Sequence, residues 1–294
     1  MQRTLPDTSH NKESGFTLVE LLIAIILSGV VVTIFIAALL TMVSTAVLQK
    51  TQLELSQRNQ IALDVIERDI RLALAFETTL PYATFDDAYG PDGTDEGWTG
   101  SWSYKGSDSD HRVLVLAERA TRTHPLAASR DPVYVRGSLD SVYAAQDLNL
   151  NCTIYNATTS PTGALTYNPK LPYYLVYFVR DGNLYRRTVT DTTTTLCAGQ
   201  QQYQKQSCPS VDSSPATTCA ANDEVIAYNV AEFTVDYFSL DDSATPTDIS
   251  AYTSTSPTIF NDISNVVVTL RLQKTVSGKD RSSTLSVRVS RVNQ

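Results

Sequence analysis

The sequence predicts an α+β fold in which one long N-terminal α-helix packs on an antiparallel β-sheet head that carries a disulfide-bearing loop insertion. Two observations lead to this prediction. A long apolar run begins at Phe16, and several later segments alternate apolar and polar side chains between short turns, as half-buried strands do. The chain has 294 residues. After a leader and a membrane helix, roughly 220 residues remain for one head domain.

The apolar run is long enough to cross a membrane. Between Phe16 and Leu48 the only ionisable side chain is Glu20, and 17 of the 25 residues in 16–40 are Leu, Ile, Val or Phe. A span needs roughly 20 residues. Those 17 side chains favour insertion by roughly 7 kcal/mol, whereas a central carboxylate costs about 3 kcal/mol. The helix therefore inserts despite Glu20, and a carboxylate kept at such a cost indicates a function.

Two other kinds of N-terminal segment share some of these features. One is an ordinary signal anchor that contains a glutamate. The other is a secretory signal peptide cleaved after Ala46, because Ser44-Thr45-Ala46 has the small-x-small pattern. The apolar region is much longer than the roughly 7–15 residues of a signal-peptide core, which argues against the secretory interpretation.

The junction Lys12-Glu13-Ser14-Gly15-Phe16, with Glu20 and the apolar residues after it, resembles the leader site of type IV prepilins. This resemblance implies that prepilin peptidase cleaves after Gly15 and that Phe16 becomes a methylated N-terminus. Glu20, fifth in the mature chain, would then pair with the N-terminal amine of a neighbouring subunit. Such a pair offsets much of the cost of burying each charge in a low dielectric.

The resemblance and the patterns together divide the chain into four parts. Residues 1–15 are the expected leader, 16–48 the transmembrane and filament-core helix, 49–76 an amphipathic continuation of that helix, and 77–294 an extracytoplasmic β-rich head with a variable, cysteine-containing insertion at 150–220. No Pro or Gly occurs between Ser44 and Pro81, so we expect one continuous helix.

The amphipathic part has an apolar stripe and a charged side. Apolar residues of the stripe recur every seven residues at Leu48, Leu55 and Ala62. The adjacent turns contribute Ile61, Val65, Ile66 and Ile70. The residues expected on the solvated side are Asp64, Glu67, Arg68, Asp69 and Arg71. Glu67 and Arg71 are four apart in the favourable order for a helical ion pair.

Strands are predicted after this helix. The clearest signal is a hairpin whose two β-rich runs, 173–180 and 183–189, flank Asp181-Gly182. In Ile263–Lys274 the side chains of Val266, Val268, Leu270 and Leu272 should face one way, and a further strand follows the turn at 277–280. The other expected strands are Arg112–Leu116, Pro132–Arg136 and Glu224–Leu240.

Features of the head indicate which type IV pilin-like proteins the chain resembles most. The run Ile61–Ala75, the hairpin segment Gly182-Asn183-Leu184-Tyr185-Arg186 and the closing pair of strands look similar to minor pilins of the PilW type and minor pseudopilins of the PulJ type. Residues 151–214, rich in Thr and Gln, depart most from that pattern.

All four cysteines fall in the head, at Cys152, Cys197, Cys208 and Cys219. An even number in an exported domain predicts two disulfides, and three pairings are possible. We favour Cys152–Cys197 with Cys208–Cys219, which would staple the loop insertion. The spacing of the last three cysteines matches no common zinc site.

Composition argues against several other functions. The net charge is −8, which argues against a dedicated nucleic-acid surface. The acidic segment 86–97 contains ligand types that Ca²⁺ takes, but it does not match the D-x-[DN]-x-[DN]-G-x₅-E loop, so we interpret it as solvated and expect no cofactor. No catalytic motif is present, and the mature chain keeps only His111 and His124, so we expect a structural subunit and not an enzyme.

The expected function is that of a minor structural subunit of a type IV pilus or related filament, with a role at the tip or in the start of assembly. A minor pseudopilin of type II secretion and a subunit for DNA uptake remain alternatives, as does an unpolymerised, membrane-anchored binding module. The expected partners are prepilin peptidase, other major and minor pilins, the inner-membrane assembly platform and membrane lipid, with a surface or DNA as candidate ligand. The subunit would be single-pass in the cytoplasmic membrane, head outside, before it joins an extracellular filament.

Overall fold

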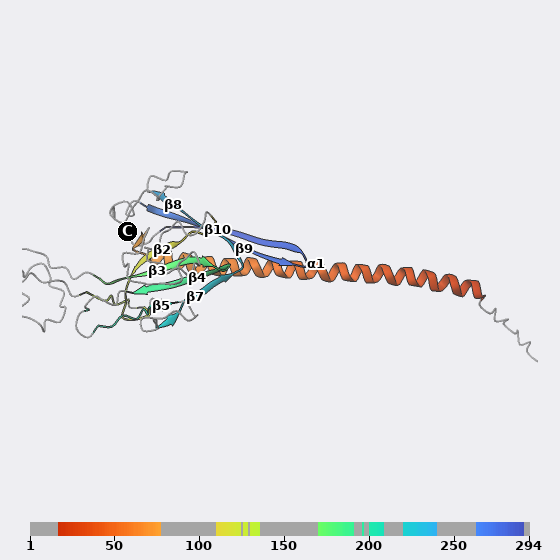
Figure 1. Cartoon of the computed structure of the whole chain (residues 1–294), viewed down its shortest axis with the longest axis horizontal. Coiled ribbons are helices and arrows are strands. Elements are labelled where there is room, and N and C mark those ends of the chain that lie inside the picture. The colour runs from red at the N-terminus through yellow and green to blue at the C-terminus, as the bar shows by residue number, and fades with distance from the viewer. Residues whose placement is uncertain are drawn as a thin grey trace, which may run out of the picture. The chain divides into compact units, whose positions relative to one another are not determined.

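The computed structural model describes residues 17–77, 110–135 without 125 and 129, 170–190, 196, 200–208, 220–239 and 263–290. The chain divides into two compact units, Met1–Thr51 and Gln52–Gln294, and each is considered by itself. The first unit contains the N-terminal part of one helix, and the second contains the rest of that helix and all the strands in the described residues (Figure 1). The predicted α+β fold is confirmed.

Helix α1 runs from Leu18 to Leu72. In the second unit its apolar stripe is buried as expected, since Leu55, Ala62, Ile66 and Ile70 are at most 3% exposed. Two expectations for this stretch are wrong. Ile61 is 63% exposed, and Asp69, expected on the solvated side, is only 2% exposed.

The helix ends four residues before the expected boundary at Phe76. The last turn tightens, with the Ala73 amide donating to the Ile70 carbonyl at 3.2 Å, and strand β1 (Ala75–Glu77) follows. The Leu74 amide then donates to the Ala117 carbonyl at 2.7 Å. The backbone thus exchanges helical hydrogen bonds for sheet hydrogen bonds while Phe76 remains fully buried.

The larger sheet has five strands in the order β1-β2-β3-β4-β7, all antiparallel. Its other members are β2 (Leu114–Arg119), β3 (Pro172–Arg180), β4 (Asn183–Thr190) and β7 (Glu224–Tyr228). Strand β2 starts two residues later than expected and extends to Arg119. Within the described part of the strand expected over Pro132–Arg136, residues 132–135 form only isolated bridges, at Pro132, Tyr134 and Val135.

The predicted hairpin between β3 and β4 is confirmed. Asp181 and Gly182 both have positive φ, 50° and 68°, the backbone that two-residue hairpin turns require. A second turn of this kind joins the last two strands at Ser277 and Gly278, with φ of 51° and 72°.

A second sheet has three antiparallel strands in the order β10-β9-β8. These are β8 (Val230–Ser239), β9 (Ile263–Val276) and β10 (Lys279–Ser290). The expected strand over 224–240 is therefore two strands in different sheets, separated at Asn229, whose φ is +60°. A short parallel pair, β5 (Ser207–Cys208) with β6 (Ala221–Asn222), completes the described strands.

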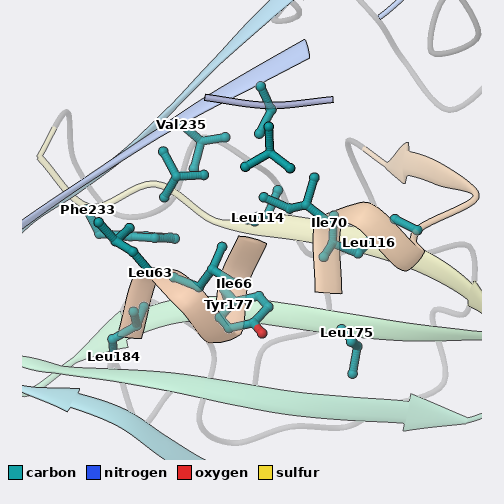
Figure 2. Packing of buried hydrophobic residues seen from close by; sticks show 14 of the residues in the cluster. Leu63, Ile66, Ile70, Leu114, Leu116, Leu175, Tyr177, Leu184, Phe233 and Val235 are labelled. Carbon is teal, nitrogen blue, oxygen red and sulfur yellow. The ribbon is translucent and has the colours of Figure 1, made fainter. Parts of the chain in front are cut away.

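The main core lies where α1 meets both sheets. Figure 2 shows Ile66 and Ile70 of α1 among Leu114 of β2, Tyr177 of β3 and Val235 of β8. The predicted inward residues of β9, Val266, Val268, Leu270 and Leu272, are fully buried in the same cluster. A smaller cluster forms on the other face of the five-stranded sheet, so β3 is buried on both sides.

Candidate functional site

Glu20 takes part in a capping box at the start of α1. Its amide donates to Thr17 Oγ1 at 3.3 Å, and its carboxylate Oε2 accepts from both the Thr17 amide and the Thr17 hydroxyl, each at 3.0 Å. Thr17 is the N-cap and Glu20 is the third helical residue, so each side chain satisfies a backbone donor that the helix leaves unpaired. The carboxylate also lies at the positive end of the helix dipole.

The hydroxyl side chains of the apolar part are satisfied within the helix itself. Between Leu18 and Thr51 each one donates to a carbonyl three or four residues earlier, at 2.8–3.0 Å; they are Ser28, Thr33, Thr41, Ser44, Thr45 and Thr51. A membrane core offers no water to unpaired polar groups, so this arrangement suits a spanning helix.

The apolar side chains of this part are exposed. From Leu18 to Val43 every large apolar side chain with a described environment is at least 44% exposed. The helix is long and apolar enough to cross a membrane. A surface of this length and composition needs lipid or other protein around it.

Several predicted site residues lie outside the described part of the structure. Gly15 and Phe16 precede it, and Cys152, Cys197 and Cys219 also fall outside. Only the backbone of Cys208 is described, in β5. The cleavage site and both disulfides therefore stay predictions, as does the interpretation of segment 86–97. Among the described residues no group of three or more His, Cys, Asp or Glu side chains is placed to hold a metal ion.

Comparison with protein families gives a match at the N-terminal end of the chain. Residues 10–36 match the family model described as the prokaryotic N-terminal methylation motif. This range includes Gly15, Phe16 and Glu20, and it confirms the resemblance noted from the sequence. The N-terminal segment of the chain therefore carries a prepilin-type methylation motif. No curated protein and no solved structure matches the chain.

The head contains a buried polar cluster that the sequence did not predict. Asp69 Oδ2 accepts from the Tyr177 hydroxyl at 2.6 Å and from Arg186 Nε at 2.7 Å, while Arg68 Nε donates to Asp69 Oδ1 at 3.1 Å. Arg186 also reaches Glu224 Oε2 at 3.1 Å. These contacts tie the C-terminal turn of α1 to β3, β4 and β7. Burial and the Asp69 charge both raise the pKa of Tyr177.

A second carboxylate, Glu118 on β2, lies beside this cluster. The Tyr173 hydroxyl donates to Glu118 Oε2, and Glu118 is 5% exposed. Burial disfavours the charged form and raises the pKa of Glu118 to about 7, although the hydrogen bond from Tyr173 acts in the opposite direction. The nearby Asp69 charge raises the pKa further, while Arg186 and Arg130 lower it.

Proposed function

We propose that this pilin-like protein is a minor structural subunit of a type IV pilus or related filament. The observation that carries the proposal is the methylation motif, which runs directly into a long helix. The apolar side chains of that helix are exposed, and its hydroxyls donate to carbonyls of the same helix. Such a helix suits two environments in turn: lipid before assembly, and the helices of other subunits within a filament. The mature chain acts through packing and charge pairing, with no catalytic role.

Glu20 and the expected cleavage site are linked by the geometry of the first turn. Cleavage between Gly15 and Phe16 would create an ammonium group on the residue before Thr17. The Glu20 carboxylate already points toward that end of the helix, because it accepts from the Thr17 amide. We infer that the capping box holds the carboxylate in the unassembled subunit. In the filament the same carboxylate pairs with the N-terminal amine of a neighbour.

The head favours a minor subunit over a major one. It occupies most of the chain, whereas a densely packed filament favours compact subunits. The expected position is the filament tip, where the subunit would help to start assembly with other pilins on the inner-membrane platform. The net charge of −8 gives no electrostatic support for DNA binding. A type IV pilus and a type II secretion pseudopilus both fit this proposal.

The proposal is tested with three variants in the native host. Glu20→Ala removes both the charge and the cap. Glu20→Gln keeps a capping side chain but removes the charge, because glutamine also serves at this position of a capping box. Thr17→Ala removes the hydroxyl of the cap and keeps the charge. Membrane fractions and sheared filaments would be compared by quantitative immunoblotting, and the mature N-terminus by mass spectrometry.

We expect all three variants in the membrane and a wild-type chain that begins with N-methylated Phe16. Both Glu20 variants should be lost from filaments, while Thr17→Ala is retained. If Glu20→Gln enters filaments as well as wild type does, the charge-pairing argument is wrong. An uncleaved Met1 in a host with active prepilin peptidase would favour the membrane-anchored binding module instead. A start at Val47 would mean a secreted head, and recovery as the most abundant filament protein would refute the minor role.

A further inference from the structure

The head contains an open cavity of about 770 Å³ beside the buried polar cluster. Its walls come from the C-terminal turn of α1 and from strands β2, β3, β4 and β7. Two connecting segments complete them, one through Arg122, His124 and Leu126 and the other through residues 201–205. All of these belong to the second structural unit. A cavity of this size is in the range of small-molecule sites, and its lining combines aromatic side chains with convergent polar groups.

Two buried oxygen atoms of residues in this lining have no hydrogen-bond partner in the described part of the chain: Glu118 Oε1 and Gln202 Oε1. The second polar atom of each side chain does have a hydrogen-bond partner. Glu118 Oε2 accepts from Tyr173, and Gln202 Nε2 donates to the Gln204 carbonyl at 3.3 Å. A buried polar atom left unpaired is costly, so native structures rarely keep one without a partner such as water or a ligand.

The charges around the cavity nearly cancel. Four cationic and three carboxylate side chains line it, namely Arg68, Arg122, Arg186 and Lys205 against Asp69, Glu118 and Glu224. Asp69 and Glu224 are already bonded to Arg186. With no dominant sign of charge, the cavity has no field that would concentrate an anion or a cation. The two unpaired acceptors also disfavour an anionic ligand, which could offer them no hydrogen.

An aromatic surface lies at the edge of the cavity. Tyr203 is 48% exposed, and its ring meets the ring of His124 edge to face, with centroids 5.4 Å apart and an interplanar angle of 72°. Exposed aromatic rings beside amide, carboxylate and guanidinium groups suit a ligand with an apolar face and a hydroxylated edge. A pyranose ring has both, with C–H groups on its faces and hydroxyls around its edge.

We propose that this cavity binds a neutral saccharide unit. Its hydroxyls would donate to the free oxygens of Glu118 and Gln202, and its C–H face would lie on Tyr203. A hydroxyl both donates and accepts, so it fits Glu118 in either protonation state, which matters because the pKa of Glu118 is about 7. An ammonium group, which only donates, would fit the ionised form alone. This inference is independent of whether the head is displayed on a filament or on a membrane.

The test uses the full chain in lipid nanodiscs, which avoids sugar-based detergents. Binding would be measured on an array of neutral oligosaccharides that includes chitotriose, cellotriose and lactose, with spermidine and inorganic phosphate as charged probes. Affinity for any positive sugar would then be compared among wild type, Tyr203→Ala, Glu118→Gln and Tyr228→Ala. Tyr228 is the matched control because it is 50% exposed but does not line the cavity.

We expect saturable binding of at least one neutral saccharide and none of the charged probes. Tyr203→Ala should weaken it by roughly tenfold, the loss expected for one contact of about 1.4 kcal/mol. Glu118→Gln should change it little, because glutamine offers a hydroxyl both an acceptor and a donor, as the protonated carboxyl does. Tyr228→Ala should leave the affinity unchanged. Circular dichroism would confirm that each variant is folded. Because Tyr203 is half-exposed, Tyr203→Ala should not unfold the head. Failure of every neutral saccharide, preference for a charged probe, or equal effects at Tyr203 and Tyr228 would each overturn the proposal.

Discussion

The hydroxyl of Tyr177 on β3 donates a 2.6 Å hydrogen bond to the carboxylate of Asp69 in the C-terminal turn of α1. Tyr177 is fully buried and Asp69 is 2% exposed, so this bond forms inside the core that joins the helix to the five-stranded sheet. Arg186 binds the same carboxylate oxygen at 2.7 Å. The helix is therefore fixed to the head at one polar point as well as by its apolar stripe.

Replacing Asp69 should destabilise the head strongly. Asp69→Ala leaves the buried Tyr177 hydroxyl without its acceptor and removes the main partner of Arg186, for an expected loss of about 3 kcal/mol in the free energy of unfolding. The matched control is Asp64→Ala, an exposed carboxylate on the same helix, where a loss within about 0.5 kcal/mol is expected. Urea unfolding of the full chain, followed by near-ultraviolet circular dichroism, would measure both. Equal losses would contradict a structural role for the buried contact.

The burial of Asp69 could have been predicted from a pattern already in the sequence. The apolar repeat by sevens through Leu48, Leu55 and Ala62 arrives next at position 69. The charge of Asp69 predicts the solvated side, whereas its position in the repeat predicts burial, and the structure follows the position. A carboxylate on a core stripe is better interpreted as a buried polar anchor with a partner elsewhere. The partner, Tyr177, is 108 residues away, and nothing local to the helix indicates it.

Glu118 should make the stability of the head fall as the pH rises. Its pKa is about 7 in the folded chain against an ordinary value of 4.5, because burial disfavours the charged form. The folded state therefore binds the proton more tightly than the unfolded state. The resulting stabilisation is fully present below about pH 4.5 and is lost as the pH rises through about 7, a change of about 3 kcal/mol. Tyr173, Asp69, Arg186 and Arg130 are the other groups that act on Glu118.

This pH dependence is best isolated as a difference between variants. Glu118→Gln resembles the protonated side chain at every pH, so its stability relative to wild type should rise between about pH 4.5 and 7 and then level off. Unfolding free energies at a series of pH values would measure that difference. The control Glu54→Gln changes an exposed carboxylate paired with Arg58, and its difference from wild type should stay nearly flat. A flat profile for Glu118→Gln would show that the pKa of Glu118 is the same in the folded and unfolded chains, which would contradict the prediction.

Arg187 and Asp223 form a second buried pair, on the other side of the larger sheet. Both side chains are 4% exposed, Arg187 Nη2 lies 2.7 Å from Asp223 Oδ2, and the Ser207 hydroxyl donates to Asp223 Oδ1 at 2.8 Å. The Arg187 guanidinium also lies over the Phe178 ring, 5.3 Å from its centroid. These contacts connect β4 with the segments that carry β5 and β6.

Breaking this pair from one side should cost more than replacing both partners. Arg187→Met or Asp223→Leu alone leaves one buried charge without its counterion, with an expected loss of about 3 kcal/mol in unfolding free energy. The double variant removes both charges and should lose clearly less than the sum of the single losses. Urea unfolding of the four chains of this double-mutant cycle would measure the coupling. Strictly additive losses would mean that the two side chains stabilise the head independently.

Local signals predicted the elements better than the way in which those elements combine. Asp181-Gly182 specified its hairpin because that dipeptide tolerates the positive φ of the turn. The division of 224–239 between two sheets follows instead from Asn229, a single residue with positive φ between two apolar runs. The head cavity depends on side chains from α1, four strands and two connecting segments, whose proximity is tertiary and leaves no periodic trace in the sequence.

Asn59 joins α1 to the second sheet from within the core. It is fully buried, and its Nδ2 donates to the carbonyls of Leu270 in β9 and Ser283 in β10, both at 2.9 Å. Asn59→Leu keeps a side chain of the same length and branching but leaves two buried carbonyls without this donor, for an expected loss of about 2 kcal/mol. Gln52→Ala is the matched control, because Gln52 donates to the neighbouring Ser282 carbonyl at 2.9 Å from an exposed position. Its loss should stay within about 0.5 kcal/mol, since water can replace the bond. If unfolding experiments find Asn59→Leu as stable as wild type, apolar packing alone holds the helix on β9 and β10.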